Sequence, residues 1–103
     1  MSKPRYAWWG YVKDMIRKYP DRTGKDLSIT QQKEFEAVRE ALKETEALHE
    51  GKTRLEIIKL VFWDKSHTLV GAAEKEYCSY ETAVNYHRQF IKLVAQKFGI
   101  FEP

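Results

Sequence analysis

Seven side chains near the C-terminal end carry the groups that proteins use to read DNA. An asparagine amide pairs with adenine and a glutamate carboxylate accepts from cytosine, so Asn85 and Glu81 suit base edges in the major groove. Arg88 and Lys92 suit phosphates or a guanine edge, and the hydroxyls among the seven suit backbone phosphates. Val84 and Gln89 are expected to face outward beside them. The candidate DNA-binding residues are Ser79, Tyr80, Glu81, Thr82, Asn85, Arg88 and Lys92.

The surrounding pattern predicts that these side chains stand on the second helix of a helix-turn-helix over residues 68–99. Such a unit needs a small residue where its two helices cross closely, and Ala73 meets that need. Tyr77 and Cys78 supply a short turn, after which Ser79 is a favourable N-cap. The inward face of the second helix then repeats at spacings of three and four residues. It comprises Ala83, Tyr86, Phe90 and Val94.

Two features weaken this unit as a lone DNA binder. Many helix-turn-helix units place glycine in the turn, where this chain has Tyr77. We therefore expect Tyr77 to take a backbone conformation that disfavours a side chain. Glu74, Glu76 and Glu81 also dilute the positive field around the unit. One copy should bind DNA weakly and need a second copy, the basic first helix or RNA polymerase.

The first 20 residues combine basic and aromatic side chains. Pro4 suits the first turn of a helix, and the pattern predicts that this helix ends before Pro20. Because Trp8 and Trp9 are adjacent, we expect one of them to face the core and the other to mark a partner surface. The basic residues are either a second nucleic-acid surface or solvated while the helix packs across the others. They are Lys3, Arg5, Lys13, Arg17 and Lys18.

Capping signals predict the helices in between. Ser28 with Gln31 forms a capping box for a second helix with a narrow apolar stripe, which ends near Gly51. That stripe suits pairing with a second copy or folding back onto the third helix. Thr53 with Glu56 predicts the start of the third helix, which is apolar nearly all round and therefore central.

The fold class that follows is all-α, with about five helices and a C-terminal helix-turn-helix. No window alternates strictly between apolar and polar residues, as a half-buried strand requires. Residues 1–50 form a helical segment suited to oligomerisation, and residues 51–103 form the helix-turn-helix unit. At 103 residues, we expect both to belong to one compact domain.

Composition excludes several classes of function. The net charge is +3, with basic ends and an acidic middle, which suits a DNA-facing surface and a separate protein-facing helix. Cys78 is the only cysteine, and the three histidines show no ligand spacing, so we expect no metal and no cofactor. No nucleophile has a paired base, so we expect no enzyme. Apolar runs are too short for a membrane span or a signal peptide, which predicts a cytoplasmic protein.

Residues 54–100 resemble the DNA-reading region 4 of sigma factors, in the version carried by phage and prophage regulators of the RinA and ArpU types. The resemblance rests on Ala72-Ala73, on Ser79 through Thr82, and on Arg88-Gln89-Phe90. It covers about half of the chain, and its motif is degenerate. The resemblance implies a transcriptional regulator of phage or prophage genes.

Two other functions fit the same sequence. A phage terminase small subunit also combines a helix-turn-helix with helical oligomerisation segments, and it serves DNA packaging. A protein-interaction adaptor, for instance one that binds RNA polymerase, needs no DNA contact at all. For the leading interpretation, the expected partners are double-stranded DNA, RNA polymerase, and a second copy in a homodimer or higher oligomer.

Overall fold

A computed structural model describes residues 7–100, and within them every regular element is helical. This confirms the all-α prediction. The elements are α1 (Trp9–Arg22), α2 (Ile29–Glu46), α3 (Gly51–Ile58), the π-helical turn η1 (Lys59–Trp63) that continues α3, α4 (Leu69–Lys75) and α5 (Tyr80–Phe98). None of these described helices is both long enough and apolar enough to cross a membrane.

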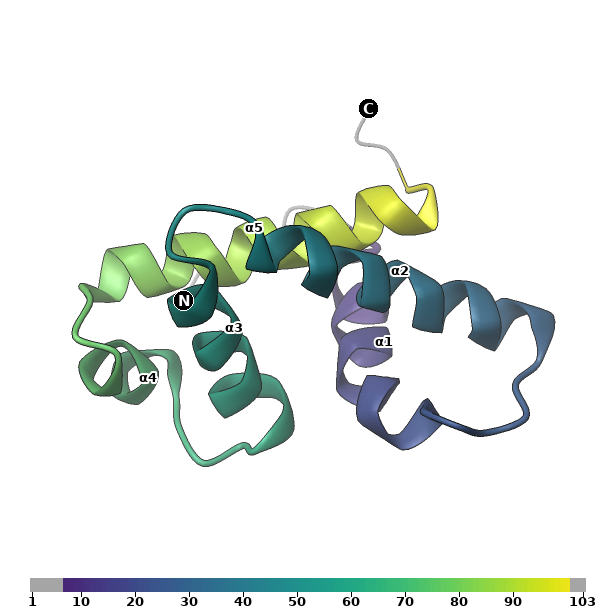
Figure 1. The fold of residues 1–103 in the computed structure, drawn as a ribbon, viewed down its shortest axis with the longest axis horizontal. Coiled ribbons are helices and arrows are strands. Elements are labelled where there is room, and N and C mark those ends of the chain that lie inside the picture. Colours follow the sequence, from purple (N-terminus) through teal and green to yellow (C-terminus); the bar gives the residue numbers. More distant parts are fainter. Residues whose placement is uncertain (1–6, 101–103) are drawn as a thin grey trace.

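The helices α2 and α5 lie along each other in opposite directions, and the other helices extend to one side of this pair (Figure 1). The ammonium group of Lys33, near the start of α2, lies 4.6 Å from the ring centroid of Phe98 at the end of α5. The first helix contacts α2, α5 and η1, and α4 packs against α5. Of the described helices, α5 is the longest, and it contacts α1, α2, α3 and α4.

Two clusters of buried side chains form the core. The larger cluster joins α1, α2, α3, η1 and α5, and the smaller one joins α3, η1, α4 and α5. Because α5 and the α3–η1 segment belong to both clusters, the two halves share one framework. The smaller cluster consists of Ile57, Leu60, Ala72, Ala73 and Ala83.

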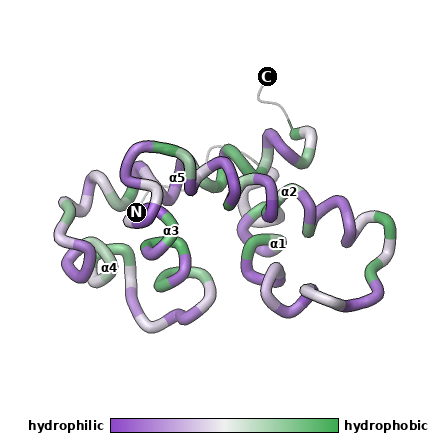
Figure 2. Tube along the Cα trace, viewed as in Figure 1, coloured by the Kyte–Doolittle hydropathy of each residue, from purple (hydrophilic) through white to green (hydrophobic). Residues whose placement is uncertain are grey.

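The second helix starts at the predicted capping box and buries part of its stripe inside the chain. The Ser28 hydroxyl accepts from the Gln31 backbone N–H at 3.1 Å, and the Gln31 side chain accepts from the Ser28 N–H at 3.0 Å. Figure 2 shows α2 as mostly hydrophilic, with hydrophobic residues at single steps. Val38 and Ala41 are fully buried, where α2 packs against α5. The stripe that suited a second copy is therefore covered in part, because Phe35 and Leu42 are only half-buried and Leu48 is 44% exposed.

The prediction that the first helix ends before Pro20 is wrong, because α1 continues to Arg22 with Pro20 inside it. Proline has no backbone N–H, so the carbonyl of Ile16, four residues earlier, loses its helical donor. The indole N–H of Trp63 donates to that carbonyl at 2.8 Å. The side chain thus replaces the missing backbone donor, and the ring of Tyr19 stacks between Trp63 and Phe35.

The connection between α2 and α3 also differs from the prediction. The second helix ends at Glu46, and Gly51 opens α3 instead of closing α2. Glu50, in the left-handed conformation with φ 57°, precedes the helix, so Thr53 lies inside its first turn and is not the N-cap. A Cβ on Gly51 would collide with the Glu46 carbonyl and lie 2.9 Å from that of Thr45. Gly51 is therefore required by the close approach of two backbones.

The expectation that only one of the two adjacent tryptophans faces the core is wrong. Trp8 and Trp9 are both half-buried and both pack against the larger cluster. Their ring centroids are 5.7 Å apart at a tilt of 38°. Trp8 has helical dihedrals and its carbonyl accepts from the Val12 N–H at 3.0 Å, so a broad side of the helix, and not a single line of residues, packs against the cluster. The interpretation that α1 packs across the other helices is confirmed.

Replacing Trp63 with phenylalanine should lower the free energy of unfolding by about 1–3 kcal/mol, because it leaves the Ile16 carbonyl without a donor. In a Pro20→Ala background the new backbone N–H supplies that donor, so the same substitution should cost less. Chemical denaturation of the four proteins in this double-mutant cycle measures the coupling, which we expect to be about 1 kcal/mol. Simple additivity of the two substitutions would contradict this account of α1.

Candidate nucleic-acid interface

The pair α4 and α5 has the predicted helix-turn-helix construction. The Thr68 hydroxyl caps α4 by accepting from the Gly71 N–H at 3.2 Å. The Ser79 hydroxyl caps α5 by accepting from the Thr82 N–H at 3.1 Å. The last helix ends, as predicted, at Gly99, which has φ 104°. Local capping signals therefore set the limits of the unit.

The turn between α4 and α5 is closed by a pair of backbone hydrogen bonds. The Cys78 N–H donates to the Ala73 carbonyl at 3.0 Å and the Tyr77 N–H to the Glu74 carbonyl at 3.2 Å, which is a Schellman motif. This motif needs a left-handed residue at its centre, and Tyr77 takes it with φ 56°. The expected unfavourable conformation of Tyr77 is confirmed. Its side chain is 97% exposed and gains no packing in return.

Small buried residues bring α4 and α5 together. Ala73 and Ala83 are almost completely buried in the smaller cluster, with Ala72 beside them. Cys78 and Tyr86 are half-buried against the same cluster. Burial, with a smaller effect from Glu76, raises the pKa of the Cys78 thiol, which favours the uncharged form. The crossing is therefore a packed contact of short side chains, as the sequence predicted.

Most of the candidate DNA-binding residues share the exposed face of α5. Glu81, Asn85, Arg88 and Lys92 are exposed, and at about 100° per residue they lie within one narrow stripe of the helix. Tyr80 is 51% exposed at the N-terminal end. Ser79 and Thr82 are engaged with each other, because the Ser79 hydroxyl donates to that of Thr82 at 2.8 Å. The structure therefore brings the seven residues together, with two of them already serving the cap.

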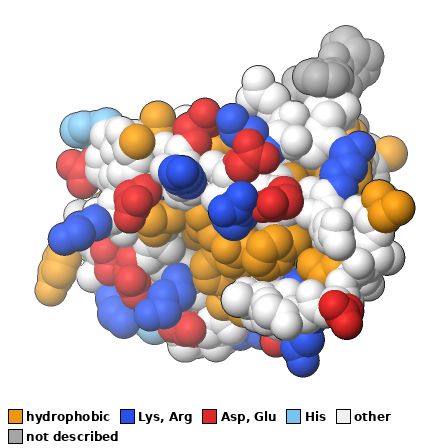
Figure 3. All heavy atoms as spheres, turned by 45° about the vertical axis from the view of Figure 1, so that its right-hand side comes forward, with side chains coloured by type: hydrophobic (Ala, Val, Ile, Leu, Met, Phe, Trp, Pro, Cys, Tyr) orange, Lys and Arg blue, Asp and Glu red, His pale blue; other side chains and the backbone are white. Residues whose placement is uncertain are grey.

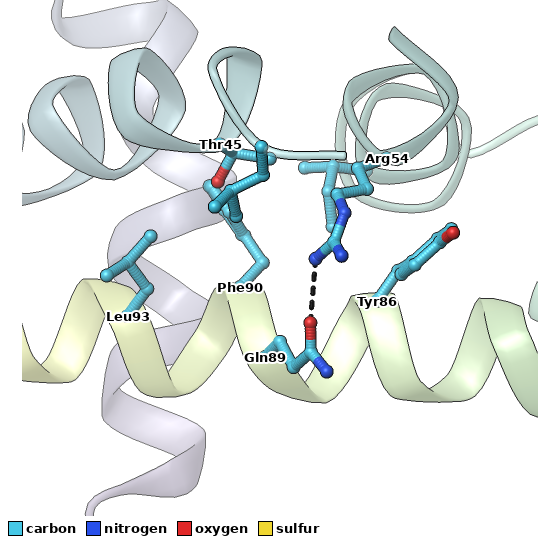
Figure 4. A pocket seen from close by; sticks show the side chains of 8 residues that line it. Thr45, Arg54, Tyr86, Gln89, Phe90 and Leu93 are labelled. Atoms are coloured by element: carbon cyan, nitrogen blue, oxygen red, sulfur yellow. Dashed lines mark hydrogen bonds between the residues drawn. The ribbon is translucent and has the colours of Figure 1, made fainter. Parts of the chain in front are cut away.

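Arg54 also contacts α5, although no local pattern singled it out. Its guanidinium lies 4.4 Å from the Tyr86 ring centroid and donates to the Gln89 side-chain carbonyl at 2.7 Å (Figure 4). It also donates to the His49 backbone carbonyl at 2.8 Å. Gln89, which was expected to face outward, is thereby tied to α3. Arg54 fixes α5 against the α2–α3 connection on the side away from α1.

His87 is partly buried and packs against the residues beneath α5. Its ring stacks on Phe62, with centroids 5.1 Å apart and planes 8° from parallel. Burial and, to a smaller extent, the positive charges of Lys13, Arg88 and Arg17 together lower the pKa of His87 to about 4. At neutral pH the imidazole is therefore uncharged, while three cations surround it.

The basic residues that were predicted to form one surface near α1 have different surroundings. Lys3 and Arg5 lie outside the described residues. Lys18 pairs with Asp14 one turn earlier at 2.9 Å, where both side chains are half-exposed. Lys13 and Arg17 lie on another edge of the helix, close to α5. Only these last two are placed to act together with the residues of the helix-turn-helix.

A different face of the molecule carries mixed charge. Figure 3 shows hydrophobic side chains in a central band, with acidic and basic side chains interspersed around it. An open groove also lies between α2 and the α3–η1 segment. Leu42, Leu55 and Trp63 contribute its apolar lining, and both lysines and glutamates line it too. Within residues 7–100, no group of three or more histidines, cysteines or carboxylates is placed to hold a metal ion.

Replacing Tyr77 with glycine should raise the free energy of unfolding by about 1 kcal/mol, because glycine adopts the left-handed conformation without a steric cost. The exposed ring makes no packing that the substitution would remove. Urea denaturation of Tyr77→Gly beside Tyr77→Ala checks this, since alanine keeps the Cβ and should show no such gain. Equal stability of the two variants would refute strain in the turn.

Acid should destabilise the protein through His87. Its folded pKa of about 4 lies below the ordinary value of 6.5, so the unfolded state binds a proton first as the pH falls. The free energy of unfolding should therefore fall by up to about 3 kcal/mol between pH 6.5 and pH 4. Denaturation of the parent and of His87→Gln across this range measures the difference in slope. Parallel pH profiles would show that His87 is not buried as a neutral ring.

Comparison with known protein families, with curated proteins and with solved structures finds no match to this chain. The interface is therefore defined by its own geometry. It consists of a capped helix pair with a close alanine crossing, a strained turn, and a stripe of exposed polar and charged side chains along the first half of the second helix.

Proposed function

We propose that this protein binds double-stranded DNA by placing the first half of α5 in the major groove. The observation that carries the proposal is the pairing of the packed α4–α5 crossing with the exposed stripe of Glu81, Asn85, Arg88 and Lys92. A major groove about 12 Å wide admits one α-helix, whose first turns meet the base edges. The buried alanines hold α4 behind α5, where it can support that helix at the groove.

Each side chain of the stripe has a role that its chemistry suits. Asn85 forms paired hydrogen bonds with adenine, and Glu81 accepts a hydrogen bond from cytosine. Arg88 lies two turns beyond Glu81 on the same face and binds a guanine edge or a phosphate. Arg54, through Tyr86 and Gln89, sets the rotation of α5 against the rest of the protein. The face of α5 that would read bases is thus held by the contacts of Arg54 and by the close packing of α5 on α4.

The resemblance to region 4 of sigma factors leads us to propose that DNA binding serves transcription control in a phage or prophage. One unit presents a short stripe that includes an acidic residue, so two copies or a contact with RNA polymerase would raise its affinity. The buried part of the α2 stripe packs against α5, which leaves its half-buried Leu42 and exposed Leu48 to a second copy. Native mass separates this function from DNA packaging. A dimer fits regulation, and a ring of about eight or more subunits fits a terminase small subunit.

Selection of bound duplexes from a random pool, followed by fluorescence anisotropy with the enriched sequence, tests the proposal. The double variant Asn85→Ala and Arg88→Ala should weaken binding to that sequence by about tenfold or more, because each residue reads a base or positions the helix. The matched control is Lys25→Ala with Thr30→Ala, which removes one positive and one polar side chain from exposed positions in the α1–α2 connection and the first turn of α2.

The control variant should bind the enriched sequence as the parent does. Unchanged affinity in the Asn85 and Arg88 double variant would show that α5 does not read DNA. No binding of the parent protein to any duplex would leave the adaptor function as the alternative.

A further inference from the structure

The basic residues of α1 differ in whether a carboxylate neutralises them. Lys18 pairs with Asp14 at 2.9 Å, and Arg22 pairs with the buried Glu34 at 2.5 Å. Among residues 7–100, no carboxylate forms an ion pair with Lys13 or Arg17. These two are four residues apart and therefore stand on one edge of the helix, about one turn from each other.

A third cation, from α5, lies at the same place. α1 packs directly on α5, and Phe62, on which His87 stacks, lies in one buried cluster with Val12 and Ile16, the residues before Lys13 and Arg17. Arg88 follows His87 on α5, and in agreement with this placement the charges of Lys13, Arg17 and Arg88 all lower the pKa of His87. Arg88, like the other two, has no ion pair with a described carboxylate. Three positive groups thus gather without a local counter-charge.

The floor of this cluster is neutral and rigid. His87 stacks flat on Phe62, and its uncharged ring adds nothing to the repulsion at neutral pH. Gathering three like charges raises the energy of the folded protein, and an anion placed over them would relieve it. Arg88 also belongs to the exposed stripe of α5, so the cluster continues the DNA-binding face directly.

We propose that Lys13, Arg17 and Arg88 form one phosphate-binding patch that holds the DNA backbone at the edge of the groove entered by α5. This assignment rests on the proposed function and adds the part of the protein outside the helix-turn-helix that touches DNA. The ligand is the phosphodiester backbone, so the patch supplies affinity and register and reads no base. The proposal assigns DNA contact to Lys13 and Arg17 and not to the neighbouring Lys18, whose charge Asp14 neutralises.

Salt dependence of DNA binding tests the patch. Anisotropy with the enriched duplex and with an unrelated duplex, from about 50 to about 300 mM salt, gives the slope of log affinity against log salt. The double variant Lys13→Ala and Arg17→Ala should weaken binding to both duplexes by a similar factor of about ten at low salt. Each lost phosphate contact lowers the slope by about 0.9, so the slope should fall by about two.

Lys18→Ala with Lys25→Ala is the matched control, because it removes the same charge from exposed lysines outside the patch. It should leave the slope close to that of the parent. The charge-conserving pair Lys13→Arg and Arg17→Lys should restore most of the affinity if the double alanine variant loses it through charge and not through misfolding. A slope for the double alanine variant equal to that of the control would overturn the patch while leaving α5 as the DNA reader.

NMR of the His87 ring gives a second readout that does not depend on affinity. Removing Lys13 and Arg17 should raise the pKa of His87 in the free protein, and bound DNA should raise it in the parent. A His87 pKa that DNA leaves unchanged would place the backbone elsewhere. Parent protein that binds neither duplex would end the proposed function as well, and that outcome is distinct from a failure of the patch alone.

Discussion

The hydrogen bond from the Trp63 indole to the Ile16 carbonyl is the contact on which the arrangement of the first helix depends. It supplies the donor that Pro20 lacks, and so lets α1 continue for its final turn. That turn carries Arg22 to the buried Glu34 of α2, where Tyr11 also donates to the same carboxyl group. A single side chain from η1 therefore joins α1 both to the centre of the protein and, through its last turn, to α2.

The placement of α1 links the core to the exposed stripe of α5. With α1 held between α2, η1 and α5, its Lys13 and Arg17 come beside Arg88 over the neutral ring of His87. On the other side of α5, Arg54 binds Tyr86 and Gln89 and fixes the rotation of the helix. The exposed stripe of α5 thus has Lys13 and Arg17 of α1 on one side and the contacts of Arg54 on the other. The orientation of that stripe is consequently a property of the whole fold and not of the helix pair alone.

Features that depend on neighbouring residues could be predicted from the sequence, and those that depend on distant partners could not. Ser28, Ser79 and Gly99 act within a few residues of themselves, so their caps followed from local spacing, and so did the strain at Tyr77. The continuation of α1 past Pro20 needs a donor from Trp63, which lies 47 residues after the acceptor Ile16. The meeting of Lys13 with Arg88 likewise depends on how α1 packs against α5, which no local pattern contains.

The sharing of α5 between both clusters has a consequence for how the protein acquires its structure during synthesis. The larger cluster needs Phe90, Ile91, Val94 and Ala95, which are translated after all the other residues that they cover. Until these leave the ribosome, the apolar faces of α1 and α2 have no complete partner and remain open to chaperones or to other chains. Native structure therefore forms late and as a unit, when the helix that carries the exposed polar stripe closes over the rest.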